Sequence, residues 1–232
     1  MNYNEITENY KIITENVEKA KADFGVNDKI NIMAVTKGVP HEKVNHAISL
    51  GIDLLGENRV QEFLQKEPFY TKTARNEKKV SIHFIGGLQN NKVKYIIDKV
   101  SLIQSADSEK LLIEINKRAA SHNLVTDILI EINIGCEWSK GGIKPDELFE
   151  FLSVAEGFDN IRVRGLMAIP PIDAKEQIYA NMQKLFHDAR NKAAKPQTKI
   201  DILSVGMSQD YITAIKHGAN LIRIGSALFG GR

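Results

Sequence analysis

The sequence predicts a single (β/α)8 barrel preceded by one extra helix. Three observations predict this fold: eight apolar, strand-like runs, stretches of helical spacing between them, and a length of 232 residues. Such an alternation is typical of parallel strands joined by right-handed helical crossovers. An open, doubly wound sheet is the alternative, but the strand count and the chain length favour the barrel.

The elements follow one another with little interruption. Residues 1–25 form an acidic segment with a helical pattern and without the basic start or apolar stretch of a signal peptide. Several strand-like runs are almost continuously apolar, as expected for strands covered on both faces. The eight runs are 30–36, 52–56, 80–86, 100–105, 126–134, 161–169, 200–206 and 220–229.

Helical spacing recurs between the strands, with clear examples at 58–66, 108–122 and 174–194. The predicted buried stripes are Leu111, Leu112, Ile115 and Ala119 in one helix and Ile178, Met182, Leu185 and Ala189 in another. The charged segment 70–79 is expected to be an exposed loop. No linker-like stretch breaks the alternation, so we expect one domain over residues 1–232.

Composition excludes several classes of protein. The 31 basic and 29 acidic residues leave a net charge of +2, which argues against a nucleic-acid binder. A single cysteine, Cys136, excludes a disulfide framework, and the six histidines lack metal-binding spacing. His83 is expected to be a hydrogen-bonded core residue. No membrane-length apolar run is present, and a cytoplasmic location is expected.

Lys37 is the first candidate functional residue, because it follows an apolar strand and precedes Gly38-Val39-Pro40, which ends that strand. A barrel carries its site at the carboxyl ends of its strands. We expect the strand to leave the Lys37 side chain little room to reach solvent. A partly desolvated lysine has a lowered pKa and forms Schiff bases with carbonyls. An ordinary surface lysine is the alternative.

The last two strands predict an anion site. Gly206 is expected to turn the backbone, Ser208 to cap the next helix, and Gly225 and Ser226 to form the final loop. Barrels often bind phosphate after strands seven and eight. An ordinary helix cap and a simple strand bend are the alternatives.

Arg223 lies two residues before Gly225 and faces the same side by strand alternation. A lysine and a phosphate site across one barrel mouth suggest pyridoxal 5′-phosphate (PLP), with Arg223 facing its pyridine nitrogen. A salt bridge to a neighbouring acid is the other interpretation of Arg223. Asn58 either lines the mouth or caps a helix, and the loop 135–142 is a lid or a plain flexible loop.

The sequence resembles the pyridoxal phosphate homeostasis protein family over essentially its whole length. The segments that carry the resemblance are AVTKGVP around Lys37, LLGENRVQE at 54–62, IHFIGGLQNNK at 82–92, EINIGCEWSKGGI at 131–143, GLMAIPP at 165–171, LSVGMSQDY at 203–211 and IRIGSALFGGR at 222–232. Departures are small: Thr36 and Ser226 stand where many relatives have serine and threonine, and Asn90 replaces a serine.

The resemblance implies the fold of the alanine racemase barrel domain, which is fold type III among PLP proteins. We expect no C-terminal β-domain, because Arg232 follows directly on the eighth predicted strand. It implies that Lys37 holds PLP as an internal aldimine. Ser208, Gly225 and Ser226 would then hold the phosphate and Arg223 would face the pyridine nitrogen. Asn58 would lie near the ring.

Three functions follow as hypotheses. The preferred one is a PLP-binding protein of intracellular PLP homeostasis that buffers or delivers the cofactor without a dedicated reaction, PLP-dependent apo-enzymes being its recipients. The second is an amino-acid racemase or related type III enzyme, which would need proton transfer on two faces of the substrate. The third is a barrel kept only as a protein-binding partner, with no cofactor. We expect a monomer, with a dimer as the alternative.

Overall fold

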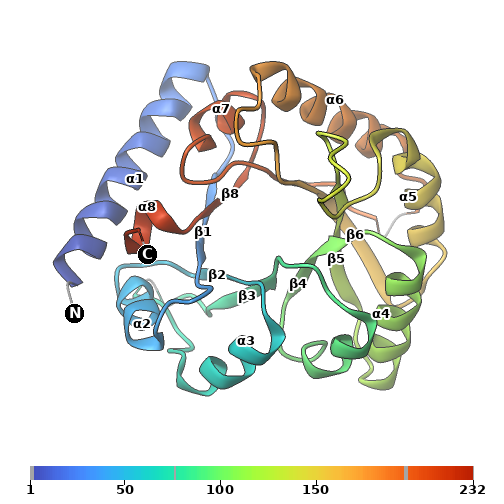
Figure 1. Cartoon of the computed structure of the whole chain (residues 1–232), viewed down its shortest axis with the longest axis horizontal. Helices are drawn as coiled ribbons and strands as arrows, with labels where there is room; N and C mark the ends of the chain where they lie inside the picture. Colours follow the sequence, from blue (N-terminus) through green and yellow to red (C-terminus); the bar gives the residue numbers. More distant parts are fainter. Residues whose placement is uncertain (1–2, 76, 196–197, 232) are drawn as a thin grey trace. The chain divides into compact units, whose positions relative to one another are not determined.

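The computed structural model describes residues 3–75, 77–195 and 198–231, in which strands and helices alternate along the chain (Figure 1). The strands hydrogen-bond in the order β1 to β8 and form a closed barrel of parallel strands. The predicted (β/α)8 barrel with its extra N-terminal helix is therefore confirmed, and the open sheet is excluded.

The strands are β1 (Asn31–Val35), β2 (Leu54–Glu57), β3 (Ser81–Phe84), β4 (Leu102–Ala106), β5 (Thr126–Ile132), β6 (Ile161–Ala168), β7 (Ile202–Ser204) and β8 (Leu221–Ile224). The α-helices are α1 (Tyr3–Phe24), α2 (His41–Ser49), α3 (Val60–Lys66), α4 (Glu109–Ser121), α5 (Leu148–Glu156), α6 (Glu176–Lys192), α7 (Tyr211–Lys216) and α8 (Ser226–Phe229). Short 3-10 helices are η1 (Glu67–Phe69), η2 (Asn90–Tyr95) and η3 (Pro145–Glu147).

The chain divides into two compact units, and the prediction of one domain over 1–232 stays a prediction. One unit comprises residues 1–82 and 206–232, and the other comprises 83–205. In the first unit α1 packs against α2, α7 and α8, and Figure 1 shows α1 in blue beside the short red α8. In the second unit α4, α5 and α6 pack against β6, and α4 also packs against β5.

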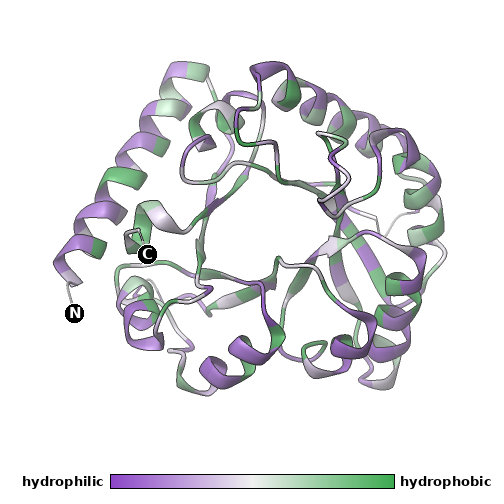
Figure 2. Cartoon of the chain, in the orientation of Figure 1, coloured by the Kyte–Doolittle hydropathy of each residue, from purple (hydrophilic) through white to green (hydrophobic). Residues whose placement is uncertain are grey.

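Apolar periodicity explains which helix faces are buried. In α1 the buried residues Ile6, Ile13, Val17 and Ala20 recur at helical spacing, and Figure 2 shows apolar and polar residues alternating along the helix. The predicted stripe of α4 is confirmed, because all four of its residues are buried. Helix α6 buries two of its four predicted residues, Met182 and Ala189, whereas Ile178 and Leu185 are half-buried. Its buried residues are Tyr179, Met182, Phe186 and Ala189.

The run 220–229 was predicted as one strand, but it is a strand only to Ile224 and a helix from Ser226. Gly225 turns the chain with φ −115° and ψ −80°, and its carbonyl accepts hydrogen bonds from the N–H groups of Leu228 and Phe229. The charged segment 70–79 holds no helix or strand and is largely exposed; its residue 76 lies outside the described residues. No described helix has the length and apolar character needed to span a membrane.

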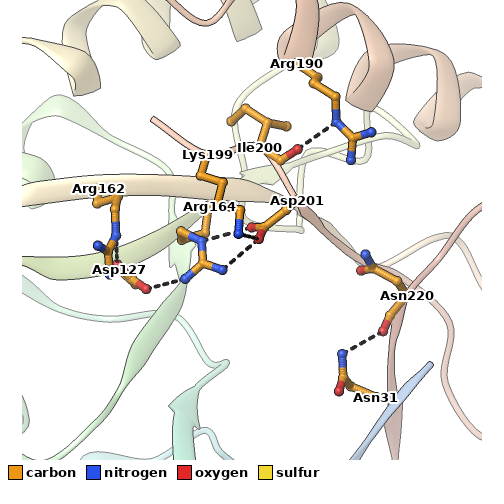
Figure 3. A network of polar contacts seen from close by, with 9 residues as sticks. All are labelled: Asn31, Asp127, Arg162, Arg164, Arg190, Lys199, Ile200, Asp201 and Asn220. Atoms are coloured by element: carbon orange, nitrogen blue, oxygen red, sulfur yellow. Dashed lines mark hydrogen bonds and ion pairs between the residues drawn. The ribbon is translucent and has the colours of Figure 1, made fainter. Parts of the chain in front are cut away.

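A chain of ion pairs joins β5, β6 and the start of β7 in the second unit (Figure 3). Arg164 donates two hydrogen bonds of 2.9 Å to the Asp201 carboxylate and one of 2.7 Å to Asp127. Asp127 also accepts from Arg162 at 2.6 Å. These groups lie at the amino ends of the strands, where barrels carry stability rather than their active sites.

Asp201 makes this network sensitive to acid. Burial acts to raise the pKa of Asp201, but hydrogen bonds from Arg164 and Lys199 outweigh it and hold that pKa below its ordinary value. The stabilisation is therefore complete above the ordinary pKa of aspartate and is lost as the pH falls through the lowered value.

We expect Asp201→Asn to lower the free energy of unfolding at neutral pH by about 1 kcal/mol, since the pair with Arg164 is bidentate and only partly exposed. The deficit should shrink as the pH falls below the ordinary range of aspartate. Urea unfolding at several pH values measures this loss of unfolding free energy. The control is Asp23→Asn, in the exposed Lys19–Asp23 pair. Equal deficits for both variants, or a deficit independent of pH, would contradict the assignment.

Candidate functional site

Strand pairing brings three of the predicted site residues to one edge of the first unit. Val35 of β1 lies opposite Gly56 of β2, and Ala34 lies opposite Ile224 of β8. Lys37, Asn58 and Gly225 follow these three strand ends by one or two residues. Because the strands are parallel, their carboxyl ends share one edge of the sheet.

The segment after β7 joins the same group through two hydrogen bonds. The carbonyl of Gly206 accepts a hydrogen bond of 3.0 Å from the Arg223 N–H. The hydroxyl oxygen of Ser208 accepts one of 3.1 Å from the Ala227 N–H, beside Ser226. The structure therefore brings Ser208 together with the Gly225–Ser226 turn, as the sequence predicted.

The prediction that Ser208 caps the following helix is wrong. Helix α7 begins at Tyr211 and Asp210 occupies its N-cap position. The Asp210 carboxylate accepts a hydrogen bond of 2.6 Å from the Met207 N–H, which closes the turn before the helix. The Ser208 hydroxyl is thereby left to bind α8. Gly206 does turn the backbone, with φ +97°.

The expectation that Lys37 has little access to solvent is also wrong, because the residue is exposed. Strand β1 ends at Val35, and the Val39 N–H donates to the Thr36 carbonyl at 3.0 Å. Gly38, with φ +67°, allows this tight turn, which carries Lys37 to the surface. Lys37 is the residue at the tip of a constrained turn.

Arg223 is the buried member of the site, with 4% of its surface exposed. It lies in β8 opposite Met33 of β1, which is fully buried. Asn58 and Ser208 are half-buried and Ser226 is exposed. The six predicted residues thus lie in one compact unit and extend from a buried arginine to an exposed lysine.

A buried ionic network behind Lys37 was missed by the sequence analysis. Glu57 is fully buried at the end of β2, and its Oε1 accepts hydrogen bonds from the hydroxyls of Thr36, at 2.6 Å, and Tyr70. Lys66 of α3 lies 3.2 Å from the same oxygen and 2.8 Å from Glu62. A glutamate ending the apolar run Leu54-Leu55-Gly56 was the available signal, because a buried carboxylate needs donors.

The network shifts the pKa values of Tyr70 and Glu62. Burial and the nearby Glu57 carboxylate raise the pKa of Tyr70 well above its ordinary value, so its phenol stays protonated and donates. Burial acts to raise the pKa of Glu62, but hydrogen bonds from Lys66 and from the Gly38 N–H outweigh it and lower that pKa. Glu62 therefore stays ionised at neutral pH.

Two consecutive residues carry buried acceptor atoms that have no hydrogen-bond partner among the described residues. They are Oε2 of Glu57 and Oδ1 of Asn58. A buried acceptor without a donor is costly, and such atoms are common where a ligand completes the site. The edge that carries Lys37 therefore suits a ligand with a hydrogen-bond donor.

The group of residues defines what the site can bind. Lys37 supplies a primary amine that can condense with a carbonyl. Ser208, Ser226 and the Gly225 turn supply hydroxyl and N–H groups suited to an anion. Arg223 supplies a permanent buried charge. Together these groups suit a small anionic ligand that also carries a carbonyl group.

Two other sequence expectations concern the second unit. His83 is buried, and its Nδ1 lies 3.0 Å from Nε2 of Gln104, so the core histidine is confirmed. Burial lowers the pKa of His83 to about 3, which leaves the ring neutral. The Asn133 side chain donates hydrogen bonds to the carbonyls of Glu137 and Lys140 in the loop 135–142, and the role of this loop stays a prediction.

Known proteins resemble this chain over most of its length. Residues 9–232 match the family described as alanine racemase, N-terminal domain. A pyridoxal phosphate homeostasis protein from Aquifex aeolicus is 39% identical over 222 residues, which cover 95% of both chains.

Solved structures give the same result. PipY of Synechococcus elongatus, determined with PLP bound, aligns with a TM-score of 0.81 and 25% identity over 97% of this chain and 100% of its own. An alanine racemase from Streptomyces lavendulae aligns with a TM-score of 0.72 and 14% identity. This chain covers 58% of that racemase, and the likeness shows the barrel fold alone.

We expect Gly206→Ala to destabilise the protein more than Gly25→Ala. Both glycines have positive φ, so both substitutions carry left-handed strain of about 1 kcal/mol. A Cβ at Gly206 would lie 2.6 Å from the Ala214 Cβ, whereas nothing lies within 4 Å of one at Gly25. The crowding adds about 1–3 kcal/mol, measured by urea unfolding. Equal losses would show that the turn after β7 is not packed as described.

Proposed function

This chain belongs to the pyridoxal phosphate homeostasis protein family, within the alanine racemase N-terminal domain family, and we propose that it binds PLP and buffers or delivers it. The observation that carries the proposal is the gathering of an amine, an arginine and two serine-containing turns in one compact unit. PLP combines an aldehyde, a phosphate and a pyridine ring. The amine suits the aldehyde, the serine-containing turns suit the phosphate, and the arginine suits the ring nitrogen.

Each site residue receives a role in the proposal. The amine of Lys37 would hold PLP covalently by condensing with its aldehyde, with loss of water. Ser208, Gly225 and Ser226 hold the phosphate through hydroxyl and N–H groups. Arg223 faces the pyridine nitrogen and Asn58 lies near the ring, where its buried Oδ1 can accept a hydrogen bond.

The residues of the chain fit this cofactor chemically. When bound, PLP supplies an electron-withdrawing ring next to the lysine. Arg223 is permanently charged, so it keeps a hydrogen-bonded ring nitrogen unprotonated and weakens the ring as an electron sink. Lys37 lies in an exposed turn, so solvent and other amines can approach the residue. Both features favour holding and releasing the cofactor over stabilising a carbanion.

A carrier without a dedicated reaction is therefore our proposal, and a type III enzyme such as an amino-acid racemase is the alternative. Several relatives at 30–39% identity bear the homeostasis name and match this chain over most of their own length. The similarity to alanine racemase supports the fold alone. The proposal includes PLP-dependent apo-enzymes as recipients, a cytoplasmic location and a monomeric state, which rest on the sequence analysis.

We expect Lys37→Ala to abolish covalent PLP binding without changing the thermal midpoint, because the exposed side chain contributes little packing. Mass spectrometry after borohydride reduction of the protein mixed with PLP measures the adduct. Lys29→Ala, another exposed lysine of the same unit, is the control and should bind PLP as the wild type does. An undiminished adduct in Lys37→Ala would refute the role of Lys37.

A second experiment separates carrier from enzyme. Loaded wild-type protein is incubated with L-alanine, and in parallel with an apo-aminotransferase and its substrates. The carrier proposal expects no D-alanine by chiral chromatography and a recovery of aminotransferase activity. Sustained catalytic formation of D-alanine would favour the racemase alternative.

A further inference from the structure

Two charged side chains of α3 hold the backbone on either side of Lys37. Nζ of Lys66 donates a hydrogen bond of 2.8 Å to the carbonyl of Thr36, the residue before Lys37. Oε1 of Glu62 accepts one from the N–H of Gly38, the residue after it. Lys66 and Glu62 also pair with each other at 2.8 Å. A single ion pair thus spans the peptide groups that flank Lys37.

The position of Lys66 is itself fixed by charge. Its side chain is only 12% exposed and lies between two carboxylates, Glu62 and the fully buried Glu57. Breaking a buried ion pair by removing one partner leaves an uncompensated charge, so the cation is held firmly where it is. Moving the Lys66 ammonium away from the Thr36 carbonyl would therefore cost free energy.

The remaining polar atoms of Thr36 are also bound. Its N–H donates to the Gly56 carbonyl at 3.0 Å, and its hydroxyl donates to Glu57 at 2.6 Å. All these contacts converge on the two residues that flank Lys37, which is itself exposed. Because these contacts hold an exposed turn and not a packed core segment, we infer that they fix the conformation of the turn.

We propose that Lys66 and Glu62 are positioning residues that keep the Lys37 turn in one conformation, so that its amine meets the aldehyde of PLP. The inference rests on the proposed function for the identity of the ligand. Preorganisation of a reacting group removes an entropic barrier, and a displacement of about 1 Å can cost about a hundredfold in rate. Loss of the pair should therefore slow covalent capture of PLP.

Glu62→Gln is the central variant. Glutamine keeps the shape of the side chain and an oxygen that can accept from the Gly38 N–H, but it loses the ion pair with Lys66. Lys66→Met removes the donor to Thr36 as well. Lys72→Met is the matched control, since Lys72 forms an exposed ion pair with Glu67 near the same helix. Lys66→Arg, which restores the charge, tests for rescue.

Two readouts are measured for every variant. The first is amide hydrogen exchange of Gly38 and Val39 in protein prepared without cofactor, which needs no PLP. We expect exchange about tenfold faster in Glu62→Gln and Lys66→Met than in wild type or Lys72→Met. The second is the rate of formation of the Lys37 adduct after PLP is added. We expect it to fall about tenfold or more in the same two variants, with partial recovery in Lys66→Arg.

The outcomes separate this inference from the proposed function. A wild type that forms no Lys37 adduct would overturn the proposed function, while the exchange data would still decide whether α3 holds the turn. A wild type that forms the adduct, with Glu62→Gln and Lys66→Met matching Lys72→Met in both readouts, would overturn the inference. If Lys66→Met does not fold, Glu62→Gln decides the outcome alone.

Discussion

The parallel pairing of β1 with both β2 and β8 is the constraint on which the candidate site depends. Backbone hydrogen bonds set Val35 beside Gly56 and Ala34 beside Ile224, although β1 and β8 are almost at opposite ends of the chain. Any residue that follows these strands must therefore lie near the others. Lys37, Asn58 and Gly225 owe their proximity to this ladder, and Ser208 joins them through its hydrogen bond to Ala227.

Charge is used for two different purposes in the two units. In the second unit, Arg164 between Asp127 and Asp201 ties three strands together at their amino ends. In the first unit, Lys66 between Glu57 and Glu62 lies behind a turn at the carboxyl ends. The network of Arg164 links strands, whereas the network of Lys66 touches both neighbours of the candidate lysine. This division follows the general placement of stability and function at opposite ends of barrel strands.

The sequence predicts the fold well because parallel strands covered on both faces appear as uninterrupted apolar runs. Apolar runs do not show where a strand ends. Ala227, Leu228 and Phe229 continue the apolar run of β8, but they belong to a helical turn that starts after Gly225. The site residues were recognised from their places after strands. Lys66 was missed because a lysine ending a helical pattern is typical of a surface residue, and its partners Glu57 and Thr36 come close only in the folded chain.

The account centres on Lys37 as the residue that holds PLP. The most direct measurement is peptide mapping of wild-type protein that has been mixed with PLP and reduced with borohydride. The account predicts one reduced pyridoxyl group per chain, on the peptide that contains Lys37, and a visible absorbance that disappears on reduction. A protein that stays colourless and unmodified, or one modified mainly at other lysines, would contradict it.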